Sequence, residues 1–325
     1  MRLVHHPVLC NYYVTYRCNA SCSFCDIWEK PSPYINLDEV DANLKDLKSL
    51  GVKVIDFTGG EPLLHRNLDL MLQMAKDLGF ITTVTTNTLL YPKYAARLKG
   101  LVDMLHFSLD SPIEEEHNRS RNVDCFGHFM DSIKIANELG EQPDILFTVM
   151  PENFDQISQV YEEIVIPNNL VLILNPIFDY AGIEADDQFS PEMLKTLSSW
   201  GKKKNVYLNE AFIQLRSDGG NHKNDPICKA ASSTVVISPN NELILPCYHL
   251  GIEKFPIENR LESLVRSEKI QSLVKMEGKY EGCEGCTVNC YMQPSFAVEI
   301  NRYWWKALSS TLKYNWIKGT WKELI

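Results

Sequence analysis

Six short apolar segments alternate with helical segments along the first 180 residues, and this alternation restricts the fold more than any other feature. The helices are expected at Leu37–Leu50, Leu68–Leu78 and Phe129–Leu139, the first beginning near Asp38, and each ends before a glycine, a common helix stop. Apolar segments of this length suit parallel strands buried on both faces. The repeats therefore predict an α/β fold, either a parallel barrel or an open sheet. The strands are expected at Val8–Tyr16, Val54–Thr58, Ile81–Thr86, Met104–Asp110, Ile145–Val149 and Val171–Ile177.

Three cysteines, Cys18, Cys22 and Cys25, follow the first predicted strand with C-x3-C-x2-C spacing. We call them the first cysteine set. Three thiolates can ligate three irons of a [4Fe–4S] cube and leave the fourth iron open to an outside ligand. A zinc site usually needs four ligands in paired spacing, and disulfides suit small secreted domains. This chain has 325 residues and no signal peptide, so the spacing predicts an iron–sulfur site for chemistry.

The same spacing resembles the radical S-adenosylmethionine (SAM) superfamily, whose signature is CxxxCx(aromatic)C with Phe24 as the aromatic residue here. The resemblance implies that SAM chelates the open iron and is cleaved to a 5′-deoxyadenosyl radical, which abstracts hydrogen from an unactivated carbon. It also implies a partial (β/α)6 TIM-like barrel, with the chemistry at the carboxyl ends of the strands. A reducing partner such as flavodoxin or ferredoxin is implied as well.

Polar motifs follow the second to fifth predicted strands. Residues 59–62 match the family's GGEP motif, which contacts the amino group of SAM, and Thr88 stands where the family often has glycine after Thr-Asn. Ser108 and Asp110 follow the fourth strand as SAM-site candidates, with a turn or helix cap as the alternative. By resemblance, the cofactor-binding residues are Phe24, Gly59, Gly60, Glu61, Pro62, Asn87, Ser108, Asp110 and Arg121.

Arg121 ends the stretch His117-Asn-Arg-Ser-Arg, which looks like the family's His-Asp-x-x-Arg with Asn118 in place of the aspartate. A guanidinium suits bidentate recognition of the SAM carboxylate, and a surface arginine is the alternative. Asn153 is a candidate of the same kind. Cys10 and Cys125 match no motif; Cys10 is expected to pack in the core, and Cys125 either to do the same or to be partly exposed.

A second cysteine set lies in the last third of the chain. Its last three members have C-x2-C-x3-C spacing, and a hairpin with its turn at Pro239-Asn-Asn-Glu separates the first two. The layout resembles the SPASM and Twitch extensions of radical SAM enzymes and implies one second [4Fe–4S] cluster, although the family's usual loop is C-x2-C-x5-C-x3-C. A zinc site is the alternative, and five cysteines for four places leave one spare. The set is Cys228, Cys247, Cys283, Cys286 and Cys290.

Three regions are expected: a radical SAM barrel over 1–220, a cluster-binding extension over 221–295 and a tail over 296–325. The tail holds four of the chain's six tryptophans, namely Trp304, Trp305, Trp316 and Trp321, and its residues 301–325 have a local charge of +4. Tryptophan mixed with lysine is typical of segments at a membrane interface. The alternative is a terminal helix whose aromatic residues dock on the barrel.

Composition restricts the possible partners and the cellular location of the protein. The net charge of −10 argues against a nucleic-acid partner, which needs a basic face. Ten cysteines without an export signal predict a reducing cytoplasm, with membrane association only through the tail. No apolar run reaches the roughly 18 residues that a membrane span needs.

The sequence therefore predicts an oxidoreductase that oxidises or hydroxylates a carbon of a bulky apolar small molecule. The most specific expectation is an anaerobic enzyme similar to bacteriochlorophyllide C7-methyl hydroxylases, in chlorophyll biosynthesis. About ten residues precede the first strand, so a built-in leader-recognition module is not expected. A peptide maturase with a separate leader-binding partner and a non-catalytic electron carrier are the other two hypotheses.

Overall fold

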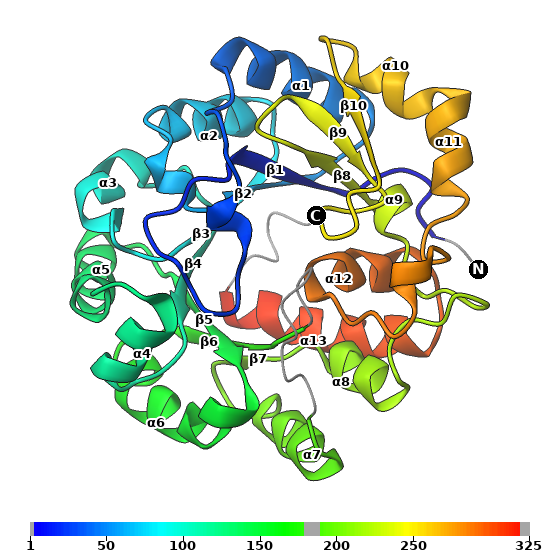
Figure 1. Ribbon diagram of the computed structural model, residues 1–325. Coiled ribbons are helices and arrows are strands. Elements are labelled where there is room, and N and C mark those ends of the chain that lie inside the picture. Colours follow the sequence, from blue (N-terminus) through cyan, green and yellow to red (C-terminus); the bar gives the residue numbers. More distant parts are fainter. Residues whose placement is uncertain (1–2, 179–188, 319–325) are drawn as a thin grey trace.

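The computed structural model describes residues 3–178 and 189–318, in which ten strands form one open sheet (Figure 1). The strand order is β10-β9-β8-β1-β2-β3-β4-β5-β6-β7. All neighbours from β8 to β7 are parallel, and β9 and β10 are antiparallel additions at one edge. The strands are β1 (Leu9–Thr15), β2 (Val54–Gly59), β3 (Ile81–Thr86), β4 (Met104–Leu109), β5 (Asp144–Val149), β6 (Val171–Pro176), β7 (Val206–Tyr207), β8 (Thr234–Ile237), β9 (Glu242–Leu245) and β10 (Glu253–Pro256).

The helices α1 to α7 surround the curved sheet, and α8, α12 and α13 lie together beside β7 (Figure 1). Five short helical turns, η1 to η5, add to them. The helices are α1 (Leu37–Ser49), α2 (Leu68–Asp77), α3 (Tyr91–Leu98), α4 (Glu114–Arg121), α5 (Phe126–Leu139), α6 (Ile157–Gln159), α7 (Pro191–Trp200), α8 (Glu210–Ser217), α9 (Ala230–Ser233), α10 (Leu261–Arg266), α11 (Glu268–Val274), α12 (Asn289–Val298) and α13 (Arg302–Lys318), and the turns are η1 (Ile27–Glu29), η2 (Pro62–Leu64), η3 (Pro151–Gln156), η4 (Val160–Val165) and η5 (Glu281–Cys283).

The six predicted strands are confirmed as β1 to β6, and the parallel, unclosed sheet agrees with a partial barrel. Helix starts were harder to predict. The α5 helix begins at Phe126 rather than Phe129, whereas α1 begins at Leu37 as predicted, with Asn36 as its cap. The Asn36 side chain accepts a hydrogen bond from the Asp38 N–H, and Glu39 completes a capping box.

One expectation about the strands is wrong for β2 to β4, because their inner faces carry polar side chains that are partly accessible. In β2, Ile55 and Phe57 are fully buried against the helices, while Asp56 and Thr58 alternate with them on the inner face and are half-buried. The same alternation places His106 of β4 on the inner face. The barrel therefore has an apolar shell outside the sheet and a polar, partly accessible interior, which we call the lumen.

The predicted hairpin is confirmed as β8 and β9, which pair antiparallel. β8 also pairs in parallel with β1, with Asn11 opposite Val236, so the hairpin extends the barrel sheet itself. This pairing places the second cysteine set beside the strand that leads to the first. The domain boundary at residue 220 stays a prediction.

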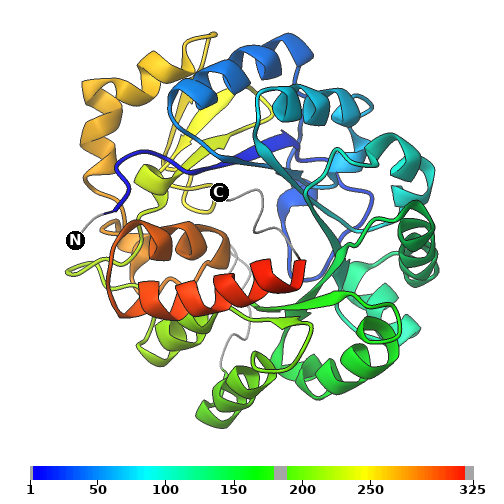
Figure 2. The ribbon, with the colours of Figure 1, turned by 180° about the vertical axis from the view of Figure 1, so that it is seen from behind.

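The tail forms helix α13, which docks on the barrel through its inner face. Tyr303 and Tyr314 are buried, and Tyr314 packs against Val171 and Tyr207 at the amino ends of β6 and β7. In the view from behind, α13 crosses in front of the strands (Figure 2, red). Trp321 lies outside the described residues. No helix within residues 3–178 and 189–318 is both long and apolar enough to cross a bilayer.

Candidate functional site

The first cysteine set lies on the loop after the carboxyl end of β1, and the last turn of α4 holds this loop in place. The Ser21 N–H donates to the carbonyl of Arg121 at 3.2 Å, and the Ser23 N–H donates to the carbonyl of Ser120 at 3.0 Å. The Asn122 side chain adds a 2.8 Å bond to the Ser21 hydroxyl. Carbonyls at the end of a helix have no partner within the helix, so they are free to bind another segment.

The three thiols lie close enough to influence one another. The pKa of the Cys18 thiol is raised to about 12 and that of Cys25 to about 11, mainly by burial and in smaller part by the Cys22 thiol. Burial also raises the pKa of Cys22, which the nearby Arg121 guanidinium opposes. Iron binds the thiolate form, so cluster binding has to release a proton from each thiol.

The two glycines of the GGEP motif bring the end of β2 against the end of β1. The Gly60 N–H donates to the Thr15 carbonyl and the Glu61 N–H to the Arg17 carbonyl, both at 2.9 Å. A Cβ atom on Gly59 would overlap the Thr15 carbonyl oxygen, and one on Gly60 would overlap that of Arg17. Glycine is required here because two backbones touch directly beside the first cysteine set.

The Glu61 side chain joins the ends of β2 and β3. It is buried and accepts hydrogen bonds from the Leu63 N–H at 3.0 Å, the Thr86 hydroxyl at 2.9 Å and the Asn87 N–H at 2.8 Å. Burial raises the pKa of Glu61 to about 7, and these three donors oppose the shift. The carboxylate therefore stabilises the loop that presents Asn87.

Asn87 reaches from the end of β3 to the first cysteine set. Its side-chain amide donates to the Asn19 side chain at 2.8 Å and lies 3.8 Å from the Cys18 sulfur. The following residue, Thr88, has a positive φ of 70°, a conformation that favours glycine. This backbone conformation explains why the family that the sequence resembles often has glycine at the position of Thr88.

Asp110 and Arg121 form a buried ion pair behind the cysteine loop. The Arg121 Nε and Nη2 atoms donate to the two oxygens of Asp110 at 2.8 and 2.9 Å, a bidentate geometry. The Ser120 hydroxyl adds a third donor at 3.2 Å. Asn153 donates to the Asp110 carbonyl at 2.7 Å and so ties η3 to the end of β4. Two of the five guanidinium donors of Arg121 thus serve the protein itself.

The lumen lies beneath these strand ends and is lined by polar side chains. Asp56 of β2 accepts a 2.5 Å hydrogen bond from the Thr83 hydroxyl of β3, and burial raises the pKa of Asp56 to about 6. Ser108 shares the inner face of β4 with His106, whose ring lies 3.3 Å from the Thr85 hydroxyl. The lumen therefore offers hydrogen-bonding groups below the first cysteine set.

The second cysteine set is assembled around Asn221, a fully buried residue that sequence reasoning missed. Its side-chain amide donates to the carbonyls of Gly278 and Cys283, both at 2.9 Å, and its side-chain oxygen accepts from the Cys228 N–H at 3.0 Å. Its backbone N–H donates to the Cys286 carbonyl at 3.0 Å. A single asparagine thus joins segments more than 50 residues apart, and no local sequence pattern indicates this role.

The thiols of the second set lie close together. The pKa of Cys247 is raised to about 12, mainly by burial and in smaller part by the neighbouring Cys286 and Cys283 thiols. Cys290, on the first turn of α12, is exposed, and its sulfur lies 3.6 Å from Nε2 of His249. Burial lowers the pKa of His249 to about 3, so this imidazole is neutral at physiological pH.

Tyrosines fill the space between the two cysteine sets. Tyr13 of β1 stacks on Tyr248 with ring centroids 4.5 Å apart, and Tyr16 packs against both rings at 5.6 and 5.7 Å. Tyr16 precedes Cys18 by two residues, and Tyr248 follows Cys247 directly. The two sets are therefore neighbours across one aromatic cluster, although the sequence separates them by 200 residues.

Both sets have the donor chemistry of iron–sulfur ligands. Within the described part of the chain, no three His, Cys, Asp or Glu side chains are arranged as ligands of one metal ion. A cube does not require that arrangement, because each thiolate binds a different iron. None of the ten cysteines is in a disulfide, and the loop of the first set begins beside the backbone of Gly59 and Gly60. These residues fit a cluster.

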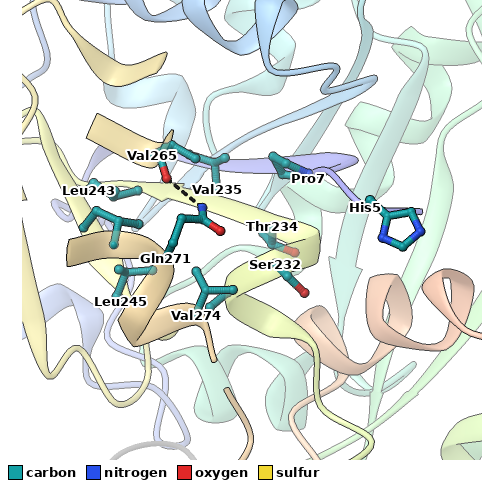
Figure 3. Close-up of a pocket in the computed structure, with 12 residues that line it drawn as sticks. His5, Pro7, Ser232, Thr234, Val235, Leu243, Leu245, Val265, Gln271 and Val274 are labelled. Carbon is teal, nitrogen blue, oxygen red and sulfur yellow. Dashed lines mark hydrogen bonds between the residues drawn. The ribbon is translucent and has the colours of Figure 1, made fainter. Parts of the chain in front are cut away.

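A separate cavity of about 150 Å³ lies outside the barrel, between the β8–β9 hairpin and α11 (Figure 3). Its lining is mixed: Leu243, Leu245 and Val274 are apolar, and the Gln271 side chain crosses it to donate to the Val265 carbonyl at 2.8 Å. No cysteine lines it, so it is separate from both cysteine sets.

Comparison with known proteins agrees with this geometry. Residues 12–164, which span β1 to η4 and include the first cysteine set and the GGEP motif, match the family described as the Radical SAM superfamily. The chain carries a radical SAM domain. The curated relatives that match this region include proteins named as enzymes.

Two curated relatives illustrate the range of proteins that share the radical SAM domain. The S-adenosylmethionine-dependent nucleotide dehydratase RSAD2 of Siniperca chuatsi is 33% identical over 111 residues, which are 32% of this chain and 31% of that protein. A probable GTP 3',8-cyclase of Saccharolobus islandicus is 32% identical over 155 residues, 46% of this chain and 50% of that protein. The chain thus spans half or less of the length of these relatives.

Solved structures share the fold over more of the chain. Streptococcus suis SuiB bound to the precursor peptide SuiA has a TM-score of 0.68 and 16% identity, covering 83% of this chain and 67% of that one. The anSMEcpe protein with bound AdoMet has a TM-score of 0.65 and 16% identity, covering 95% and 97%. At these identities the likeness shows the fold alone.

The structure brings most of the predicted residues together. The GGEP residues and Asn87 surround the first cysteine set, and Asp110 with Arg121 lies behind its loop. The five later cysteines form one group, Cys10 is fully buried, as expected, and Cys125 is fully buried as well. Ligation by these residues stays a prediction.

Proposed function

We propose that this protein is a radical SAM enzyme that binds a [4Fe–4S] cluster through the first cysteine set and cleaves SAM reductively. When bound, the cluster would supply the electron that splits SAM into methionine and a 5′-deoxyadenosyl radical. The observation that carries the proposal is the three-thiol loop, which β2, β3 and α4 hold at the carboxyl end of β1. This is the end of a barrel at which chemistry is found.

The residues around the loop have distinct roles in this proposal. Gly59 and Gly60 allow the close backbone approach, Phe24 and Pro62 lie next to the ligands and the motif, and Asn87 orients Cys18. Arg121 keeps donors beyond the two that Asp110 accepts, and these suit the carboxylate of SAM. Ser108 lies at the lumen edge of the same site.

We further propose that the second cysteine set binds a second [4Fe–4S] cluster. Its support is that Asn221 binds the backbones of Cys228, Cys283 and Cys286, that the Cys247 and Cys290 thiols lie near this group, and that the tyrosine cluster lies between it and the first set. A second cluster next to the lumen would accept the electron that a substrate radical releases, and the net result would be an oxidation. A flavodoxin or ferredoxin would return electrons to the protein.

For the substrate, the sequence favoured a bulky apolar molecule such as a bacteriochlorophyllide with an oxidisable ring methyl. The aromatic residues between the cysteine sets support this choice. The polar lumen, with Asp56, Thr83 and His106, instead supports a substrate with hydrogen-bonding groups.

That polar lining favours a second candidate, a peptide maturase with a separate leader-binding partner. Two structures of the same fold, SuiB with its precursor peptide and anSMEcpe with the Cp18Cys peptide, hold peptides. A peptide backbone presents N–H and C=O groups that the polar wall of the lumen would satisfy.

The testing experiment is mass spectrometry of anaerobic reactions in which reduced, reconstituted protein is mixed with fractionated extract. Native protein and the Cys22→Ala variant are compared. A mass loss of two hydrogens, or the gain of one oxygen, in a pigment fraction supports the first candidate, and the same change in a peptide supports the second.

The release of 5′-deoxyadenosine decides the reaction class. Native protein should form it from SAM and a reductant, and Cys22→Ala should not. If the reconstituted protein holds its full iron and sulfide and cleaves no SAM, the protein is an iron–sulfur electron carrier and the enzyme proposal is wrong.

A further inference from the structure

The two most exposed large apolar side chains of the described residues lie on one helix. Trp316 is 77% exposed and Trp305 is 63% exposed, and both belong to α13 together with Leu312, which is 41% exposed. Spacings of seven and four residues place all three on one line along the helix. We call this line the tryptophan stripe.

The rest of α13 is firmly held, so the stripe is a fixed surface rather than a frayed end. The Tyr303 hydroxyl donates to Asp218 at 2.7 Å, and the Ser310 hydroxyl accepts from the Glu210 N–H at 3.1 Å. Near its end, Lys318 pairs with the fully buried Asp144 at 2.9 Å. The docking that covers one face of the helix thus leaves the opposite face, with its tryptophans, in water.

Positive charge surrounds the tryptophan stripe. The helix contains four basic residues and no acidic one; Arg302 and Lys318 pair with Asp218 and Asp144, and Lys306 is exposed. Lys313 donates to the carbonyls of Gly201 and Lys203, which fixes the turn of three exposed lysines at 202–204 beside the helix. Lys204 and Trp316 line one cavity of about 370 Å³. In a chain of net charge −10, this local basic surface is a marked exception.

We propose that the tryptophan stripe and the lysine turn at 202–204 bind the surface of a membrane that contains anionic lipids. Tryptophan favours the boundary between headgroups and acyl chains, and lysines beside it are attracted to anionic headgroups. No described helix crosses a bilayer, so the contact is peripheral. The acidic remainder of the chain would be repelled from the same surface, which orients the protein.

This contact is independent of the proposed chemistry. Tyr314 of α13 packs against the amino ends of β6 and β7, whereas the first cysteine set follows the carboxyl end of β1. These are opposite ends of the parallel sheet, and Figures 1 and 2 show them on opposite sides of the molecule. A protein bound through α13 keeps its cysteine-bearing end open to water.

The test is co-sedimentation of the full chain with vesicles of phosphatidylcholine alone or with 30% phosphatidylserine, the latter composition being roughly that of an anionic leaflet. Binding is expected only with phosphatidylserine and should weaken at high salt. Trp305→Ser combined with Trp316→Ser should weaken binding by about tenfold or more. Lys202→Ser combined with Lys204→Ser should weaken it roughly 30-fold.

Matched controls change similar residues elsewhere. Ile252→Ser with Met276→Ser removes two exposed apolar side chains, and Lys99→Ser with Lys134→Ser removes two exposed lysines. Both controls should bind as the native chain does, and circular dichroism confirms that every variant is folded. The proposal is wrong if the α13 variants bind normally, if phosphatidylcholine alone suffices, or if sedimentation velocity shows that the stripe joins two copies and no vesicle is bound.

Discussion

The two cysteine sets reach their sites in opposite ways. The first set lies within eight residues on one loop, so the chain brings its thiols together locally. The second set spreads over 63 residues and depends on the β8–β9 hairpin, η5, α12 and the buried Asn221. A local motif can be recognised from spacing, while a dispersed site exists only after the tertiary structure has formed.

The largest expected effect comes from breaking the local set. Cys22→Ala should lower 5′-deoxyadenosine formation by roughly 1,000-fold or more, because the ligand that it removes cannot be replaced by a neighbour. Iron content should fall by about half, since the second set is intact. Iron analysis and electron paramagnetic resonance measure both quantities. Complete loss of iron would mean that the two sets do not load independently.

Substitution of one residue that is not a cysteine should disrupt the dispersed second set. Asn221→Ala removes two donors and one acceptor from buried backbone groups, and leaving them unpaired should cost about 3 to 4 kcal/mol of unfolding free energy. Chemical denaturation measures this value. Asn137→Ala, at an exposed helix position, is the control and should change it by less than about 0.5 kcal/mol.

The Asn221→Ala variant also separates the two sites. It should lose the iron of the second set and keep the spectrum of the first. A variant that loads both clusters normally would contradict the role given to Asn221.

The next largest effect is expected from a substitution at the backbone contact beside the first set. Gly60→Ala places a methyl group on the Arg17 carbonyl and should destabilise the protein by about 2 kcal/mol, with loss of SAM binding. Gly127→Ala on α5 is the matched control, because a Cβ there meets no atom within 4 Å. Thermal unfolding and isothermal titration with SAM measure the two effects. Equal results for both variants would show that the close approach is unimportant.

The smallest expected effect concerns the lumen beneath the first set. Because the folded-state pKa of Asp56 is raised to about 6 from 3.8, its protonated form stabilises the fold at low pH, and this contribution is lost as pH rises through 6. Between pH 4 and pH 7, native protein should lose about 1 to 2 kcal/mol relative to Asp56→Asn, since the half-buried carboxylate keeps some hydration. Denaturation at several pH values checks the slope, and parallel curves for the two proteins would rule out this assignment.

The sequence predicted β1 to β6 well, because each apolar segment and its flanking turn residues report local burial. It did not predict the polar inner faces of the strands. A single polar residue such as Asp56 barely lowers the mean hydropathy of a strand, so the segment still reads as apolar. The start of α5 was also misjudged, because its cap comes from another helix: the side-chain oxygen of Asn118 in α4 accepts from the Cys125 and Phe126 N–H groups.

Sequence alone determined the local chemistry of this protein: the three-thiol loop, the glycines that must touch another backbone, and the alternation that specifies a parallel α/β sheet. Only the tertiary structure decided that β8 joins β1, that Asn221 assembles the later cysteines, and that α13 docks with its tryptophans outward. The physical reason is range. Spacing and periodicity record contacts within a few residues, whereas these three features depend on hydrogen bonds and packing between segments about 60 to 200 residues apart, which leave no local pattern.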